Sequence, residues 1–196
     1  MKIEKHGRFI VFEGIDGAGT TTQSELLFNN LKSNGIDCLL TREPWNSHPG
    51  ILATKAIKKE KNIGATSLQL LFCADRAEHL EKEIIPALEE GKIVICDRYY
   101  YSTLVFGELS KVEKKLIEKI NDYFLKPDIC FLLDCDPEIA LGRIKKRGEK
   151  EEKFEKLPLL REASKIYKKI SRLEEVIRID GNKSKEEIFS ELQLYL

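Results

Sequence analysis

Phe9-Ile-Val-Phe-Glu-Gly-Ile-Asp-Gly-Ala-Gly-Thr-Thr-Thr-Gln23 is the stretch that decides the fold of this 196-residue chain. It begins with a short apolar run, Ile10 to Phe12, which is typical of a parallel strand buried on both faces. The glycines that follow permit backbone angles that are closed to other residues. The threonines add hydroxyl groups at a helix start, where free N–H groups and the helix dipole favour an anion. The stretch therefore predicts a strand, an anion-binding turn and a helix.

The turn matches the phosphate-binding loop pattern G-x-x-x-x-G-K-[ST] at all but one of its defined positions. Gly14, Gly19 and Thr21 are in register with the pattern, but Thr20 occupies the lysine position. Gly-rich turns between a strand and a helix occur in many α/β proteins, so a purely structural tight turn is the alternative. The rest of the chain has to distinguish the two.

The composition suits a single α/β domain with a sizeable core. The 33 basic and 33 acidic residues cancel, so charge indicates neither a nucleic-acid nor a membrane partner. We expect no signal peptide and no membrane span. The five cysteines form no Cys-x-x-Cys pair, and we interpret them as reduced core residues of a cytoplasmic protein rather than metal ligands or disulfides.

Apolar runs of strand length alternate with longer amphipathic segments along the chain. After the first strand, further strands are expected at residues 36–40, 92–96, 129–133 and 176–179. Helices are expected between them, including one at 111–124 and a long helical region at 66–89 that Pro86 kinks or divides. This alternation predicts a parallel sheet with right-handed crossovers and helices on both faces.

Charged residues follow two of these strands, at the edge where open parallel sheets bind ligands. Thr41-Arg-Glu-Pro-Trp45 follows the second strand, and an ordinary surface loop is an equally good interpretation of it. Asp97 ends the third strand, a usual place for a carboxylate that holds Mg²⁺ through water. Arg98 suits a phosphate, because its planar guanidinium can bind two oxygens at once.

Phe72 and Arg76 are four positions apart in the long helical region, so they share a helix face. A ring and a guanidinium side by side can stack on a nucleobase and hydrogen-bond its edge. The alternative is a core phenylalanine beside a solvated arginine. His79 is expected to be an ordinary, partly exposed histidine.

A basic cluster lies on the helix that Asp136 caps and Pro137 begins. It includes Arg143 and Arg147, and a polar run follows it. Residues from about 142 to 155 suit a lid that closes over a polyphosphate, with a solvated helix end as the alternative.

Together these motifs resemble those of the thymidylate (dTMP) kinase family, and the resemblance covers nearly the whole chain. The segments that carry it are residues 12–19, 41–44, 71–76, 97–103 and 127–137. It implies one nucleoside monophosphate kinase domain over residues 1–196, of the P-loop NTPase type. This is an α/β three-layer sandwich around a five-stranded parallel sheet. It also implies that ATP phosphorylates dTMP to dTDP with Mg²⁺ as cofactor, in a homodimer.

The resemblance also implies roles for individual residues. The ATP-binding positions are Gly14, Ile15, Asp16, Gly17, Ala18, Gly19, Thr20, Thr21 and Thr22. The dTMP-binding positions are Asp16, Arg42, Pro44, Phe72, Arg76, Arg98, Ser102, Thr103 and Phe106. The catalytic positions are Asp16, Arg98, Arg143 and Arg147, and the metal positions are Thr21 and, through water, Asp97.

The chain departs from the family pattern at two positions. Thr20 replaces the usual loop lysine, and Gly107 replaces a frequent glutamine. We expect a lid cation, Arg143, Arg147 or Lys150, to supply the missing charge. The alternatives are a nucleotide-binding protein with weak or no kinase activity, and a kinase for another nucleoside monophosphate.

Overall fold

The sheet of this computed structural model is built as the strand and helix pattern predicts. Within residues 6–148 and 152–196, which the structure describes, five parallel strands pair in the order β2-β3-β1-β4-β5. Their bounds are Arg8–Gly14 for β1, Cys38–Arg42 for β2, Ile93–Asp97 for β3, Ile129–Asp134 for β4 and Val176–Asp180 for β5. The predicted five-stranded parallel sheet is confirmed, although β2 begins and ends two residues later than expected.

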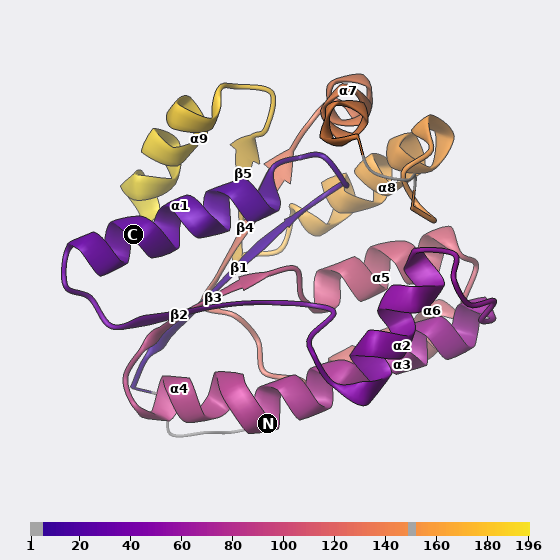
Figure 1. Ribbon diagram of the computed structural model, residues 1–196, viewed down its shortest axis with the longest axis horizontal. Coiled ribbons are helices and arrows are strands. Elements are labelled where there is room, and N and C mark those ends of the chain that lie inside the picture. Colours follow the sequence, from indigo (N-terminus) through magenta and orange to yellow (C-terminus); the bar gives the residue numbers. More distant parts are fainter. Residues whose placement is uncertain (1–5, 149–151) are drawn as a thin grey trace.

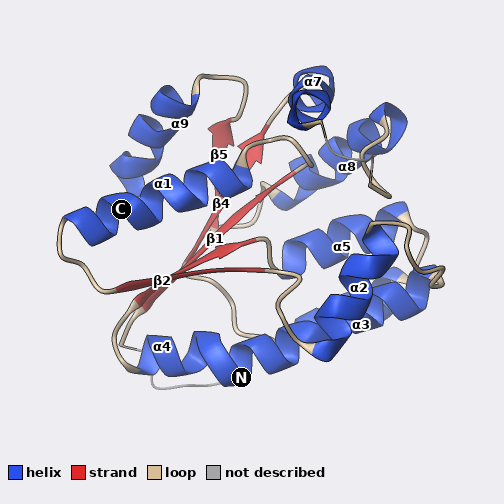
Figure 2. Ribbon diagram, in the orientation of Figure 1, coloured by secondary structure: helices blue, strands red, loops and turns tan. Residues whose placement is uncertain are grey.

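Helices cover both faces of the sheet (Figures 1 and 2). On one face, α1 (Thr20–Ser33) packs on β1 and β3, and α9 (Lys185–Leu192) packs on β5. On the other face, α4 (Ile85–Glu89), α5 (Tyr100–Leu109) and α8 (Leu157–Ile170) contact β3, β1 and β4 in turn. The remaining α-helices are α2 (His48–Ile57), α3 (Ala65–His79), α6 (Lys114–Asn121) and α7 (Pro137–Arg147). The predicted three-layer α/β sandwich is confirmed, and α6 is shorter than expected.

Strand side chains form the core because parallel strands are covered on both sides. Phe9, Ile10, Val11 and Phe12 of β1 have no exposed surface. The ring of Phe12 packs against that of Phe131 on β4, with centroids 5.4 Å apart. All five cysteines are buried and free, which confirms that they lie in the core. No helix in the described ranges is long and apolar enough to cross a membrane.

The long helical region divides where its proline predicts. A single π-helical turn, Leu80–Ile84, separates α3 from α4, and Pro86 lies in the first turn of α4. Proline has no N–H, and its ring clashes with the carbonyl four residues earlier, so the regular ladder is interrupted before it. Such π-helical turns are frequent at functional sites. Here the turn follows directly after His79.

The carboxyl ends of β1, β2 and β3 lie together because β3 pairs with both neighbours. Asp97 is opposite Phe12 of β1 and Arg42 of β2. The N–H of Arg98 donates to the carbonyl of Phe12 at 2.9 Å, and the N–H of Glu43 donates to that of Asp97 at 3.0 Å. Three motifs that are far apart in the sequence therefore meet at one sheet edge.

We predict that Phe131→Ala lowers the free energy of unfolding by about 3–5 kcal/mol, because it opens a cavity between β1 and β4. Urea unfolding measures the change. Leu194→Ala is the matched control, since Leu194 is 80% exposed, and its effect should stay within about 0.5 kcal/mol. Equal losses in the two variants would contradict this picture of the core.

Candidate functional site

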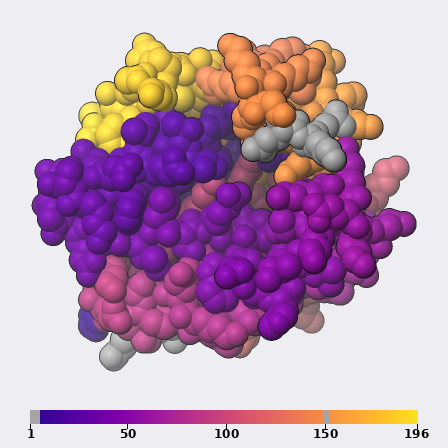
Figure 3. Space-filling view, viewed as in Figure 1, coloured from indigo at the N-terminus to yellow at the C-terminus, as the bar shows by residue number. Residues whose placement is uncertain are grey.

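Two connected cavities open at the carboxyl edge of the sheet. The larger one, about 910 Å³, lies between the turn after β1, the end of α2 and helix α7. The smaller one, about 130 Å³, lies between α3, α5 and the segment after β2. Figure 3 shows the surface hollowed where the indigo, purple and orange segments meet. Asp16, Arg42, Pro44, Arg98 and two further residues line both cavities, so these side chains stand at the junction.

The turn between β1 and α1 forms one wall of the larger cavity. Gly17 has φ +82°, and a Cβ atom there would lie 2.4 Å from the carbonyl oxygen of Ala140 on α7. Only glycine fits this combination of angle and contact. The expected ATP-binding positions that line the cavity are Asp16, Gly17, Gly19, Thr20, Thr21 and Thr22. Gly14, Ile15 and Ala18 belong to the turn but do not line the cavity. Ile15 and Ala18 are at most 3% exposed, so they pack on the core side of the turn.

Both expected lid arginines line the same cavity as Thr20. Arg143 donates to the carbonyls of Gly181 at 2.9 Å and Ala18 at 3.3 Å, which attaches α7 to the turn. Arg147 forms an ion pair with the buried carboxylate of Glu155. Lys150, the third cation considered, lies outside the described residues.

Thr21 and Asp97 provide oxygen atoms suited to Mg²⁺. The hydroxyl of Thr21 donates to Oδ2 of Asp97 at 2.5 Å. Oδ1 of Asp97 is buried and has no hydrogen-bond partner among the described residues. Mg²⁺ prefers oxygen ligands, keeps several waters, and in phosphate sites needs only one or two protein ligands. Accordingly, no cluster of three or more His, Cys, Asp or Glu side chains in the described ranges could hold a metal by itself.

Arg98 is held rigidly at the junction of the cavities. Its backbone has φ +74°, which is uncommon for a residue other than glycine and is often found at functional sites. Its guanidinium donates to the carbonyl of Gly14, to the hydroxyl of Tyr167 at 3.2 Å and to Asp16 at 2.8 Å. Burial acts to lower the pKa of Arg98, but Tyr167, Asp16 and Glu13 outweigh it and raise the pKa. The group is therefore a permanent, oriented cation.

Glu13 anchors this arrangement, although the sequence analysis did not single it out. Its carboxylate is 1% exposed and accepts hydrogen bonds from the N–H groups of Tyr99 and Ser102, at 2.9 and 3.0 Å. It also accepts from the hydroxyls of Ser102 and Tyr167, both at 2.7 Å. Burial raises the pKa of Glu13, and Arg98 opposes that shift. The available signal was a charged residue directly after the apolar run of Ile10 to Phe12.

The smaller cavity gathers all the expected dTMP-binding residues. They come from the turn after β1, the end of β2 and the segment after it, α3, the segment after β3, and α5. They are Asp16, Arg42, Pro44, Phe72, Arg76, Arg98, Ser102, Thr103 and Phe106. Arg76 is 2% exposed, so it is not the solvated arginine of the alternative interpretation. Phe72 remains partly buried and lines the cavity wall.

The hydrogen bonds of Arg76 leave one donor for a ligand. Its Nε and Nη2 donate to Oε2 of Glu43, at 2.9 and 2.6 Å. Nη2 also donates to Thr103 at 2.9 Å, and Nη1 donates to Asn121 at 2.8 Å. An arginine side chain has five N–H groups, so one N–H of Nη1 has no partner among the described residues. Arg76 lines the smaller cavity, so this donor is one that a bound ligand could use.

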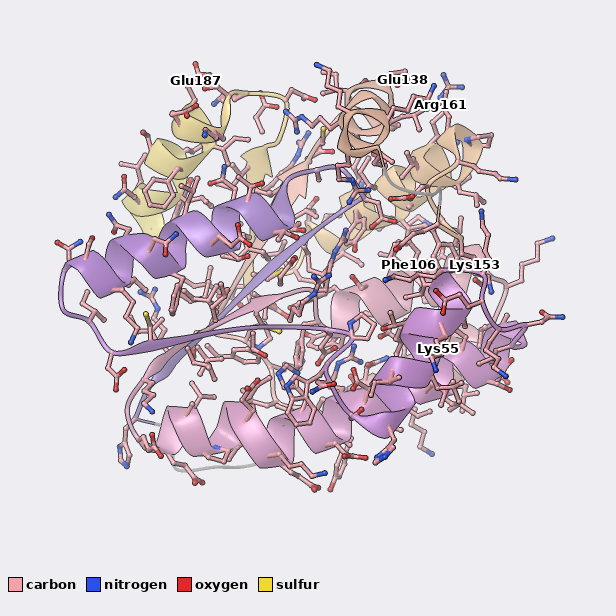
Figure 4. The ribbon with its side chains drawn as sticks, viewed as in Figure 1. Lys55, Phe106, Glu138, Lys153, Arg161 and Glu187 are labelled. Atoms are coloured by element: carbon pink, nitrogen blue, oxygen red, sulfur yellow. The ribbon has the colours of Figure 1, made fainter. Side chains whose placement is uncertain are left out.

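The segment after α7 reaches the smaller cavity from the opposite side. The ring of Phe154 stacks on Phe106, with centroids 4.6 Å apart. The N–H of Lys153 donates to the carbonyl of Ile57 at the end of α2, at 3.0 Å. Figure 4 shows Phe106 and Lys153 beside each other. The described residues from α7 to Glu155 therefore connect the two cavities. Residues 149–151 are outside the described ranges.

The prediction for His79 was wrong, because its side chain has no exposed surface. It lies among Thr41, Glu43, Trp45 and Glu83, which come from β2, the segment after it and the π-helical turn. Glu43 was part of a quoted motif but was not assigned a role. Helical periodicity could not reveal the burial of His79, since its partners belong to other segments.

We predict that Gly17→Ala weakens binding of a nucleoside triphosphate about tenfold or more, which corresponds to about 1.4 kcal/mol, because the new Cβ pushes the turn away from α7. Gly35→Ala is the matched control: Gly35 has φ +75°, but its Cβ would meet no described atom within 4 Å. Both variants should lose about 1–2 kcal/mol of stability to backbone strain. Isothermal titration calorimetry separates the effects, and similar affinities in the two variants would contradict the close approach.

Comparison with known proteins places this site in a family. A sequence model described as thymidylate kinase matches residues 12–192. A probable thymidylate kinase of Pyrococcus horikoshii is 40% identical over 192 residues, which cover 95% of this chain and 94% of the relative. A thymidylate kinase of Leptospira interrogans is 39% identical over 191 residues, with 96% and 93% covered. A probable thymidylate kinase of Methanocaldococcus jannaschii is also 39% identical, over 189 residues, with 96% and 95% covered. With this similarity along nearly its whole length, and with the two cavities described above, the chain belongs to the thymidylate kinase family.

Proposed function

We propose that this protein transfers the γ-phosphate of ATP to the 5′-phosphate of dTMP, giving dTDP. The observation that carries the proposal is the meeting of two cavities at Arg98 and Asp16. A donor phosphate chain against the helix start and an acceptor nucleotide in the smaller cavity would bring their phosphates together there. Phosphoryl transfer requires mainly this positioning and cations around the transferring group.

Each part of the site has a task in this reaction. The N–H groups at the start of α1 would bind the donor phosphates, and Arg98 would bind the acceptor phosphate. Phe72 would stack on the base, while the free N–H of Arg76 would bind its edge. Thr21 and Asp97 would hold Mg²⁺, partly through water, and the ion would neutralise phosphate charge. Phe106 would crowd the sugar.

The atypical loop requires a replacement cation. Thr20 stands where the family pattern has lysine, so one positive charge is missing beside the β- and γ-phosphates. Arg147 is the better candidate of the two described arginines. Arg143 uses its N–H groups on backbone carbonyls, whereas Arg147 is paired with a side chain of the same segment. We propose that Arg147 turns to the phosphates when ATP is bound.

We also propose the organisation around this site. Residues 1–196 form one nucleoside monophosphate kinase domain, and residues from about 142 to 155 act as its lid, which excludes water from the reaction. The protein works as a homodimer in the cytoplasm and binds neither nucleic acid nor membranes. Gel filtration with light scattering tests the dimer.

A coupled assay of ADP release with dTMP, dUMP, dCMP and dGMP as acceptors tests the proposed reaction. Highest kcat/KM with dTMP is the expected result. Preference for another acceptor would indicate a different nucleoside monophosphate kinase, for which Gly107 would be the position to examine. ATP binding without any ADP release would indicate a nucleotide-binding protein that is not a kinase.

We predict that Arg98→Ala lowers kcat/KM for dTMP on the order of 10³-fold and leaves the dissociation constant of ATP nearly unchanged, because the lost contact strengthens as charge develops. Arg98→Lys should recover only part of the rate, since an ammonium lacks the planar fork. Steady-state kinetics measure both variants. The control is Arg178→Ala, whose side chain is 60% exposed at the edge strand β5. Rates within about threefold of the unmodified protein would remove Arg98 from the site.

We predict that Thr20→Lys raises kcat about tenfold or more, because it restores a charge at the transferring phosphate. A double-mutant cycle with Arg147→Ala measures the coupling between the two positions. The penalty of Arg147→Ala should shrink when lysine is present at position 20. Equal penalties in both backgrounds would show that the two groups are independent. A parallel cycle with Arg143→Ala serves as the comparison.

A further inference from the structure

A buried histidine stands behind the smaller cavity, between two carboxylates. Nε2 of His79 lies 3.0 Å from Oε2 of Glu83 and 2.8 Å from the hydroxyl of Thr41, and Nδ1 lies 3.4 Å from Oε1 of Glu43. The indole of Trp45 stacks on the imidazole, with centroids 5.1 Å apart and planes 12° from parallel. The ring is therefore fixed on both edges and on one face.

Glu43 is the link between this histidine and the cavity. It is 6% exposed and lines the cavity wall. Its Oε2 accepts two hydrogen bonds from Arg76, while its Oε1 faces His79. The position of Glu43 sets the direction in which the guanidinium of Arg76 points. His79 itself does not line the cavity, and Glu43 lies between it and Arg76.

The protonation state of His79 follows from its partners. The hydroxyl of Thr41 donates its hydrogen to Oε2 of Glu83 at 2.5 Å. That hydrogen is therefore not available to the imidazole. Each ring nitrogen faces a carboxylate, and a neutral imidazole has an N–H on only one nitrogen. Both bridges form only in the imidazolium state. Burial acts to lower the pKa of His79, but the bonds to Glu43 and Glu83 outweigh it and raise the pKa.

The other ionisable groups in this region do not take over the role of His79 as the proton-dependent bridge. On α3, Arg76 is paired with Glu43, and Asp75 accepts from Ser47 and from the N–H of Trp45. Burial raises the pKa of Cys96 on β3 and of Tyr99 well above their usual values, so both stay neutral. Glu83 has a lowered pKa, mainly because of its bond to His79, so it is ionised at neutral pH.

We propose that His79 is a positioning residue for the acceptor base: as an imidazolium it bridges Glu43 and Glu83 and thereby holds Glu43 against Arg76. This role rests on the proposed function, because it concerns the same acceptor site. When the imidazolium loses its proton, its single remaining N–H is shared between two competing carboxylates, so His79 holds Glu43 less firmly. The acceptor nucleotide then binds more weakly, while ATP, which lies in the other cavity, is unaffected.

The pH dependence has a definite sign. A proton on His79 favours the acceptor complex, so affinity for dTMP is highest below the raised pKa and falls as pH rises through it. By the same linkage, dTMP binding takes up a proton and raises that pKa further. Folding stability follows the same direction. The contribution of His79 is fully present below the ordinary histidine pKa of about 6.5 and is lost as pH rises through the folded value.

NMR and calorimetry test the proposal on the full chain. The protein has three histidines, so His→Gln variants assign their ring resonances. We expect the titration midpoint of His79 to lie above the ordinary histidine pKa of about 6.5 and to rise when dTMP is added. We expect the dissociation constant of dTMP to rise about 5- to 10-fold between about pH 7 and 9, where its phosphate is already doubly ionised, and that of ATP to stay constant.

Matched variants separate positioning from general stability. His79→Gln should weaken dTMP about 5- to 10-fold at pH 7 and abolish the pH step, with little change in ATP affinity. Glu83→Gln changes a half-buried position and should shift the pH-dependent fall in dTMP affinity to lower pH. This variant tests the proposal even if His79→Gln folds poorly. The controls are His48→Gln, at an exposed position, and Glu78→Gln on α3, whose ion pair with Lys82 lies at the surface.

Two results would contradict different statements. If the unmodified protein binds no dTMP, the proposed function fails, and the role of His79 fails with it. If dTMP binds but its affinity is flat with pH and insensitive to His79→Gln and Glu83→Gln, only the positioning role is overturned.

Discussion

The buried carboxylate of Glu13 is the interaction on which the arrangement of this site depends. It is the penultimate residue of β1, and its four hydrogen bonds come from the start of α5 and from Tyr167 on α8. Removing it would leave those donors unpaired in the core, at a cost of about 1–3 kcal/mol for each group left unsatisfied. Arg98, 3.7 Å away, shares this environment. One carboxylate thus fixes the strand end, the helix start and the cation at the cavity junction.

The base side of the site depends on a second set of buried charges. Arg76 and Glu43 are nearly inaccessible to water, and breaking such a pair by removing one partner is far more costly than losing an exposed pair. Such a pair is a weak source of stability, because its desolvation opposes its attraction. Its benefit here is orientation. Four of the five N–H groups of Arg76 are bound within the protein, so the fifth has a defined direction.

Local patterns in the sequence determined most of the fold and which residues line the site. Apolar runs such as residues 10–12 and 129–133 predict buried parallel strands because their side chains can be covered on both faces. Asp136 and Pro137 predict the start of α7, and Asp136 indeed accepts from the N–H of Glu138 at 2.9 Å. Since the strands are parallel, the motifs that follow them had to meet at one edge. That is why every residue expected at the acceptor site lines one cavity.

Tertiary structure decided which partners those residues have, because hydrogen bonds and burial join positions that are distant in the chain. Tyr167 binds Glu13 across 154 positions, and no local pattern indicates that pairing. His79 carries an ordinary helical signal, yet packing of β2 and the π-helical turn encloses it completely. The strand order, which places β3 between β1 and β2, is likewise set by packing of whole elements. The sequence therefore determined which groups reach the site, while the fold decided how each is held and charged.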